Sequence, residues 1–340
     1  MANEGRLIRL TSSDIASTAA LGVNLTNAEI AAKLEAGEAN FASKSGVSPR
    51  AVCADYSGNL YVCDRLSHAI YKIDEGGQIS TYAGEPGTSG DNGTLTNVAA
   101  LDARFTNPRG IACDKSGNIY VADTGNNQIR VIRDGFVSHV AGDGGGVSGA
   151  SDGVGGAASF DGPFDLDVDP SGVVWVADTG NNMIRRIIDG TVYTFAGSQV
   201  AGDKENVAVT AEEIFDAPQA ISVDQNGDLF VCDTGNRKIK KVTQTGHVYL
   251  HSGSGSLGRS LGTTAFNCEY DTLVRSDIDA SGNLYVVDSD VDGSAGSRLL
   301  RISSNGIPSV INDFNGTTVD GSVVGVAVSP AGKFFVISFE

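Results

Sequence analysis

The most specific chemical signature in the sequence is an acidic run that matches the first half of a calcium-binding loop. Asp288, Asp290 and Asp292 alternate with other residues and are followed by Gly293. Alternating carboxylates suit a hard cation such as calcium, and the glycine permits the sharp bend that such a loop makes. Calcium is therefore the one cofactor that the sequence suggests.

A calcium site at this position needs a further carboxylate. The twelfth position of the loop, where a glutamate normally supplies two oxygen ligands, holds Leu299. A neighbouring loop can supply the missing ligand through Glu269 or Asp271. The alternative interpretation is an acidic, solvated loop without a metal.

A second candidate site consists of arginines that lie at equivalent places in separate parts of the chain. Arg50 and Arg109 each follow a proline directly, and Arg275 lies one step further along a matching segment. Guanidinium groups that converge can bind an anion through paired hydrogen bonds. Salt bridges to nearby aspartates are the alternative explanation for these arginines.

Other polar residues favour structural roles. Aspartates recur at the ends of five similar apolar runs: Asp64, Asp123, Asp178, Asp233 and Asp288. Aspartate at such turns accepts backbone hydrogen bonds, so the recurrence points to the fold rather than to catalysis. The four histidines have neither metal-binding spacing nor a partner nucleophile. We therefore predict no catalytic residues.

These candidate residues belong to a unit that repeats six times. Its opening glycines are 50 to 59 residues apart: Gly58, Gly117, Gly172, Gly227, Gly282 and Gly332. Each complete unit contains four short β-rich runs separated by turns, as at 110–113, 119–122, 129–132 and 136–141. The pattern predicts an all-β, six-bladed β-propeller with four-stranded antiparallel blades, formed by a single domain over residues 1–340.

An aromatic residue recurs three positions after each of these glycines. The set is Tyr61, Tyr120, Trp175, Phe230, Tyr285 and Phe335. Large rings at equivalent places in twisted sheets fill the space between them. We therefore interpret these residues as a packing layer between neighbouring blades.

Residues 107–130 resemble an NHL repeat. They read Asn-Pro-Arg-Gly-Ile-Ala-Cys-Asp, then Gly-Asn-Ile-Tyr-Val-Ala-Asp-Thr-Gly-Asn-Asn, then Ile-Arg, and residues 49–73, 163–185 and 218–240 match them. The resemblance implies a β-propeller but no single activity, because NHL-like propellers include binding scaffolds and enzymes.

A gluconolactonase-type propeller is the enzyme model that the resemblance suggests. It implies metal-binding acidic and amide side chains around the central channel. The comparable ring in this sequence reads Arg50, Arg109, Phe164, Gln219, Val274 and Val324, with Asp165 one step further. This ring contains no set of four such ligands.

The two ends of the chain are predicted to share a blade. The last repeat ends after two strand-like runs, whereas residues 6–10 resemble a third strand and residues 15–21 a fourth. Residues 1–22 are therefore expected to complete the blade that residues 323–340 begin. Such closure removes the open sheet edges that promote aggregation.

Composition restricts the partners and the location. The net charge of −17 argues against nucleic acid, because phosphate binding needs a basic surface. No segment is long and apolar enough to span a membrane, and the first residues lack the features of a signal peptide. The five cysteines occupy strand positions that favour buried thiols over disulfides. We expect synthesis in the cytoplasm, followed by action there or in a virion.

The segments between blades are the best candidates for partner binding. They cover residues 84–107, 142–162, 197–217 and 253–272, and long connections are usually functional or disordered. The glycine-rich segment 142–162 is interpreted as a flexible loop, with Asp143, Gly146 and Ser151 as contact residues.

The predicted function is a non-catalytic protein-interaction or assembly module that binds a protein through the face carrying these segments. A phage capsid decoration or tail protein is one such component of a larger particle. The alternative is a divalent-metal-dependent hydrolase, lactonase or lyase that acts at the channel mouth.

Overall fold

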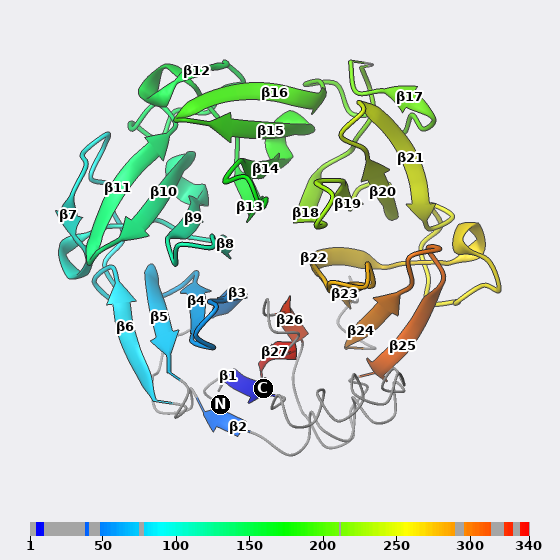
Figure 1. Ribbon diagram of the computed structural model, residues 1–340, viewed down its shortest axis with the longest axis horizontal. Helices are drawn as coiled ribbons and strands as arrows, with labels where there is room; N and C mark the ends of the chain where they lie inside the picture. Colours follow the sequence, from blue (N-terminus) through cyan, green and yellow to red (C-terminus); the bar gives the residue numbers. More distant parts are fainter. Residues whose placement is uncertain are drawn as a thin grey trace.

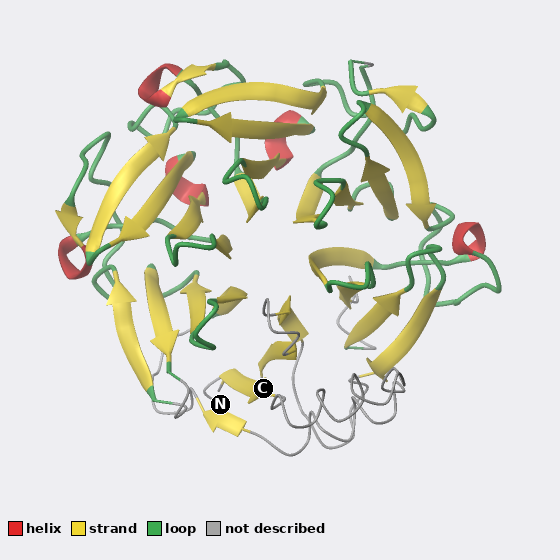
Figure 2. Cartoon of the chain, in the orientation of Figure 1, coloured by secondary structure: helices red, strands yellow, loops and turns green. Residues whose placement is uncertain are grey.

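A computed structural model of the chain describes residues 5–9, 38–40, 48–74, 78–210, 212–289, 296–313, 323–328 and 334–339. These residues form an all-β propeller whose antiparallel sheets are arranged around a central channel (Figure 1, Figure 2). No helix in the described ranges is long and apolar enough to cross a bilayer.

Five blades of four or five strands are each built from one continuous stretch of chain. The first contains β3 (Pro49–Ala54), β4 (Leu60–Asp64), β5 (Ala69–Ile73) and β6 (Ile79–Ala83). The second contains β7 (Val98–Ala99), β8 (Gly110–Cys113), β9 (Ile119–Asp123), β10 (Gln128–Arg133) and β11 (Phe136–Ala141).

The third blade contains β12 (Gly153–Val154), β13 (Pro163–Val168), β14 (Val174–Asp178), β15 (Met183–Ile188) and β16 (Thr191–Gly197). The fourth contains β17 (Val207–Ala208), β18 (Pro218–Val223), β19 (Leu229–Asp233), β20 (Lys238–Val242) and β21 (His247–Ser252). The fifth contains β22 (Thr272–Ile278), β23 (Leu284–Ser289), β24 (Ser297–Ile302) and β25 (Pro308–Asp313).

A further antiparallel sheet combines strands from both ends of the chain. It contains β1 (Gly5–Arg9), β2 (Glu38–Asn40), β26 (Val323–Val328) and β27 (Phe334–Phe339), in the order β2-β1-β27-β26. The strand that pairs with the outer edge of β1 is β2, whereas we expected residues 15–21 there. Residues 15–21 lie outside the described ranges.

The innermost strands surround the channel. These are β3, β8, β13, β18, β22 and β26, and each contacts the next in this order, with β26 against β3. Consecutive sheets pack through apolar clusters that combine residues of two neighbours. Tyr61, for example, packs with Ile111 and Ile119 of the second blade, and Trp175 packs with Ile221 of the fourth. The predicted packing role of the recurrent aromatic residues is confirmed at these positions.

The connections between blades are more ordered than a flexible loop. Strands β7, β12 and β17 each add a fifth, outermost strand to a blade. The 3-10 turns η1 (Ala100–Asp102) and η3 (Gly155–Ala157) follow the first two of these strands. The segment 142–162, which the sequence predicts to be a flexible surface loop, is irregular apart from η3 and from β12, which pairs with β16.

Candidate functional site

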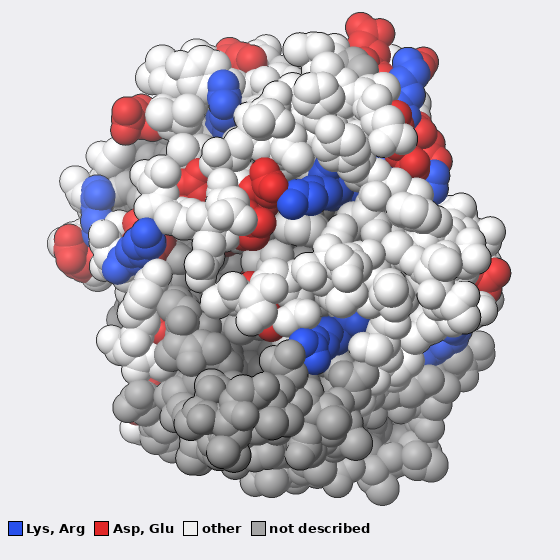
Figure 3. Space-filling view, turned by 45° about the vertical axis from the view of Figure 1, so that its right-hand side comes forward, with Lys and Arg blue, Asp and Glu red and all other residues white. Residues whose placement is uncertain are grey.

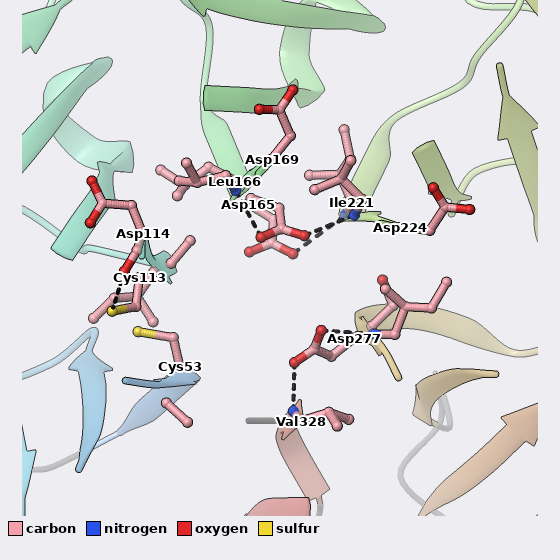
Figure 4. Close-up of a pocket in the computed structure, with 18 of the residues that line it drawn as sticks. Cys53, Cys113, Asp114, Asp165, Leu166, Asp169, Ile221, Asp224, Asp277 and Val328 are labelled. Atoms are coloured by element: carbon pink, nitrogen blue, oxygen red, sulfur yellow. Dashed lines mark hydrogen bonds between the residues drawn. The ribbon is translucent and has the colours of Figure 1, made fainter. Parts of the chain in front are cut away.

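The channel contains a cavity of about 340 Å³. The innermost strands line it, and it extends to the turns that follow them, at Tyr56, Lys115, Pro170, Gln225 and Ala280. Figure 4 shows Asp165 and Asp277 on different strands at this cavity, with Cys53 and Cys113 across from Asp277. The cavity therefore combines carboxyl groups and thiols in an otherwise largely apolar wall.

Three carboxyl groups of the cavity also join neighbouring strands. Asp167 accepts a hydrogen bond from the backbone N–H of Val223 (2.8 Å), and Asp277 accepts one from that of Val328 (2.6 Å). Asp165 accepts a longer one from Ile221 (3.4 Å). Each carboxyl group thus contacts the innermost strand of the next sheet.

The surroundings of these acids favour their neutral forms. Burial raises the pKa of Asp165 to about 6, although nearby Arg275 opposes this shift. Burial raises the pKa of Asp277 to about 7, with a further contribution from Asp165. The pKa of Asp167 lies well above its usual range because of burial and of repulsion by Asp277. Perturbed acids in a cavity are candidates for acid–base chemistry or ligand binding.

The acids and thiols of the cavity are residue types that can bind a metal ion. Within the described part of the chain, no group of three or more His, Cys, Asp or Glu side chains is arranged to hold a metal ion. All five cysteines are free, as expected, and all but Cys113 are buried. Their high pKa values, raised first by burial, keep Cys53 and Cys113 as thiols at neutral pH.

Arg275 crosses the channel at the inner end of the cavity. Its Nε donates to the backbone carbonyl of Arg50 (3.0 Å), and its Nη2 donates to that of Arg109 (2.8 Å). Its Nη1 donates to the carbonyl of Val274 (2.7 Å), and the residue is 3% exposed. Arg275 thus links the fifth blade to the first and second blades, and these three carbonyl oxygens engage all three of its nitrogens.

Arg50 and Arg109 lie at the start of the innermost strands β3 and β8, as predicted, and Arg65 joins them from the end of β4. Burial lowers the pKa of Arg109 to about 10, and the positive charges of Arg50, Arg65 and Arg275 add to the effect. Phe164 lies beneath two of these side chains: its ring centroid is 4.7 Å from the guanidinium carbon of Arg109 and 4.6 Å from that of Arg275.

The recurrent aspartates have the structural role that the sequence indicates. Asp178, for example, is fully buried and accepts hydrogen bonds from the backbone of Asp161 (2.8 Å), from Asn181 (2.8 Å) and from Arg185 (2.7 Å). Equivalent backbone contacts are made by Asp64, Asp123, Asp233 and Asp288.

Asp288, the first residue of the predicted calcium loop, is one of these buried anchors. One carboxylate oxygen accepts from the backbone N–H groups of Asp271 and Thr272 (both 2.9 Å). The other accepts from Nε (2.8 Å) and Nη2 (2.7 Å) of Arg298. The calcium prediction therefore depends on Asp290 and Asp292, which lie outside the described residues.

The predicted contact residues of segment 142–162 are anchored to the blades. Asp143 accepts from the backbone N–H of Gly145, and the carbonyl of Gly146 accepts from Asn127. The carbonyl of Ser151 accepts from Arg185. These residues therefore lie in a tethered segment, and two of them contribute backbone rather than side-chain contacts.

Sequence reasoning missed Asp167, Asp277 and Arg65. Asp167 and Asp277 occupy the same place in their strands, opposite Trp175 and Tyr285, and this shared register was an available signal. Arg65 follows Asp64 where three other blades have Thr124, Thr179 and Thr234. That departure from the repeat could have identified Arg65.

Known proteins resemble the chain in sequence over part of its length. The NHL repeat family profile matches residues 105–132. Teneurin-3 of Danio rerio is 28% identical over 223 residues, which cover 58% of this chain and 8% of that protein. NHL repeat-containing protein 2 of Homo sapiens is 30% identical over 168 residues, which cover 45% of this chain and 23% of that protein. The chain thus spans less than a third of the length of these relatives.

Solved structures resemble the whole fold. A gluconolactonase from Xanthomonas campestris has a TM-score of 0.55 at 12% identity, covering 87% of each chain. A chain of the nidogen/laminin complex has a TM-score of 0.55 at 12% identity, covering 99% of this chain and 98% of its own. Virginiamycin B lyase from Staphylococcus aureus has a TM-score of 0.50 at 11% identity, covering 87% and 96%. At such identities the likeness shows the fold alone. The chain is thus a β-propeller protein that carries an NHL repeat and resembles NHL repeat-containing proteins.

Proposed function

We propose that this propeller is a non-catalytic protein-interaction or assembly module. It binds a protein partner through its loop face, defined as the face with the blade-to-blade connections and the turns between second and third strands. Exposed apolar side chains in the connections support this proposal. Seven of the fourteen exposed large apolar residues in the described ranges lie there: Leu95, Leu101, Val147, Val154, Val200, Leu257 and Phe266.

The connections are held firmly enough to present these side chains. Three equivalent asparagines donate from the turns between second and third strands to connection carbonyls: Asn126 to Gly90, Asn181 to Gly149 and Asn236 to Gly202. Val147 and Val200 lie two residues before the second and third of these glycines, and they are 64% and 53% exposed. A preorganised apolar surface loses less conformational entropy on binding.

The similar proteins are compatible with a protein-binding role. The relatives in sequence are much longer proteins, and one similar structure comes from a complex between two proteins, nidogen and laminin. The partner proposed here is either a soluble intracellular protein or the rest of a larger particle such as a virion.

The proposal can be tested by quantitative affinity purification. The double variant Val147→Asp, Val200→Asp should lose partners that the wild type retains, because it places charge in the centre of an apolar contact. Tyr56→Asp is the matched control, since Tyr56 is 57% exposed in a turn at the opposite end of β3. Loss of the same partners in Tyr56→Asp but not in the double variant would contradict the proposal.

We also propose that the sheet β2-β1-β27-β26 acts as a sixth blade and closes the ring. Antiparallel pairing of β1 with β27, from Gly5 opposite Phe339 to Arg9 opposite Phe335, supports this role. The contacts of β26 with both β22 and β3 support it as well.

A second candidate function is a hydrolase, lactonase or lyase that acts in the channel cavity. Asp165 and Asp277, with pKa values raised to about 6 and 7, are suited to exchange protons near neutral pH. Two of the similar structures are a gluconolactonase and a lyase by title. Turnover of a lactone that is lost in Asp277→Asn and unchanged in Val147→Asp would favour this function over the first.

A further inference from the structure

Three arginines meet at the channel mouth on the loop face, where the first blade departs from the repeat. In three other blades the hydroxyl of a threonine donates to the innermost strand of the next blade: Thr124 to Pro163 (2.7 Å), Thr179 to Pro218 (2.6 Å) and Thr234 to Leu273 (2.7 Å). The first blade has Arg65 at this place. Because Arg65 occupies the same place in its blade as these threonines, it lies next to the start of β8, where Arg109 lies.

Within the described residues, these side chains form no ion pair at salt-bridge distance, although Asp64 lies near enough to oppose slightly the lowering of the pKa of Arg50 that burial causes. The surface view shows acidic and basic side chains lying next to one another (Figure 3), and Lys238, for instance, pairs with Asp203 and Glu205 at 2.6 and 2.7 Å. No ion pair within the described residues involves Arg50, Arg65 or Arg109. Sequence reasoning held open salt bridges to aspartates as their explanation, and no such pair is found in the described ranges.

Two guanidinium nitrogens in this group are buried without a hydrogen bond. The Nε atoms of Arg65 and Arg109 have no partner in the described structure. A buried donor without an acceptor destabilises the fold, and more so when it carries a charge. Mutual repulsion among the three arginines adds to this cost. An anion bound between the guanidinium groups would offset this repulsion.

Arg275 lies across the channel next to these arginines. It directs its N–H groups to backbone carbonyls, so it supports the strands that carry Arg50 and Arg109 and is not free to bind a ligand. The ring of Phe164 lies under Arg109 and restrains its guanidinium group. The predicted anion-binding set of Arg50, Arg109 and Arg275 is therefore changed to Arg50, Arg65 and Arg109.

We propose that Arg50, Arg65 and Arg109 form an oxyanion site that takes a carboxylate from an acidic segment of a protein docked on the loop face. Planar guanidinium forks match the two oxygens of a carboxylate. The assignment to a protein carboxylate rests on the proposed function, since Arg65 lies in a turn between a second and a third strand, which belongs to the loop face. Oxyanion binding itself does not rest on it.

The test uses the full chain and measures melting temperature and calorimetric affinity with sodium citrate, against sodium chloride of equal ionic strength. Arg65→Thr restores the residue found in three other blades, so this variant should fold. Arg133→Gln, at an exposed arginine at the far end of β10, is the matched charge control. Citrate should raise the melting temperature of the wild type and of Arg133→Gln by about 2 °C or more.

Arg65→Thr and Arg109→Gln should each bind citrate at least about tenfold more weakly. A short poly-glutamate peptide should compete with citrate in the wild type. Equal citrate affinity in wild type and Arg65→Thr, or no effect beyond that of chloride, would overturn the site. Binding of inorganic phosphate without citrate or poly-glutamate would overturn the carboxylate assignment. Val147→Asp should keep citrate binding, so failure of the proposed partner face is distinguishable from failure of this site.

Discussion

At the residue scale, the aspartates inside the protein form two groups that differ in which neighbouring groups stabilise their negative charge. Those at the ends of the second strands receive several hydrogen bonds and, in Asp178, Asp233 and Asp288, a buried cation. Within the described residues, Asp167 and Asp277 in the channel accept hydrogen bonds from backbone N–H groups only. Burial nevertheless raises the pKa in both groups, to about 7 in Asp277 and in Asp123, so the protonation of either should be coupled to folding.

This coupling gives a prediction for pH. An unfolded aspartate has a pKa near 3.9, whereas that of Asp277 is raised to about 7 in the fold. The folded state therefore holds the proton more tightly. The stability that Asp277 contributes is fully present below about pH 4 and is lost as the pH rises through 7.

The wild type should thus unfold at a lower denaturant concentration at pH 8 than at pH 5, measured by chemical denaturation. Asp277→Asn, which cannot ionise, should flatten this dependence. Asp102→Asn, a change at an exposed acid in η1, should leave the dependence unchanged. An equally steep dependence in Asp277→Asn would show that this acid is not responsible.

At the element scale, single asparagines attach whole connections to the blades. Asn181 donates to both Gly149 (2.7 Å) and Asp178 (2.8 Å). Asn181→Ala should lower the free energy of unfolding by about 1–3 kcal/mol, because it leaves a buried carbonyl and a carboxylate oxygen without this donor. Hydrogen exchange in residues 143–156 should increase. Asn226→Ala, in an exposed turn, should change neither quantity.

The calcium prediction also belongs to the element scale. Because Arg298 and two backbone N–H groups already engage Asp288, any calcium affinity should depend on Asp290 and Asp292. Excess calcium should raise the melting temperature relative to a chelator, and Asp290→Ala should abolish the difference. Superimposable melting curves with calcium and with chelator would eliminate the site.

Elements that depend on local sequence patterns were predictable, and features that depend on how the blades are arranged around the channel were not. The repeat identified the strands, the aspartate turns and the aromatic layer, because turn chemistry and burial repeat along the chain. Phe105, Phe160 and Phe215 are fully buried in their connections, whereas Phe266 in the next connection is 56% exposed and fully buried Tyr270 takes this place. The spacing between the aromatic residue and the following strand differs in this connection, so the replacement of phenylalanine by Tyr270 was not evident from the sequence.

The candidate site was harder to predict for a related reason. The reach of Arg275 across the channel depends on how separate blades meet, which no local pattern records. Asp167 and Asp277 lie in short strands where buried and half-buried residues do not alternate regularly, so the sequence pattern does not reveal which side chains face the channel.

At the scale of the whole molecule, stability should depend on how the ends of the chain are joined. Strand β1 pairs with β27 along its full length, and β26 contacts both β3 and β22. Removing residues 1–22 deletes β1 and leaves the edge of β27 unpaired, and an open edge both loses hydrogen bonds and invites intermolecular pairing. We expect insolubility or a large fall in melting temperature.

The control for this truncation is removal of residues 1–4, which retains all of β1 and should melt like the full chain. A chain lacking residues 1–22 that also melts at the full-length temperature and stays monomeric would contradict closure by the termini. Intermediate behaviour is informative as well. If the truncated protein is folded but oligomeric, addition of a peptide with the sequence of residues 5–9 and their flanks should restore the monomer, because the exposed edge of β27 can pair with a strand supplied in trans.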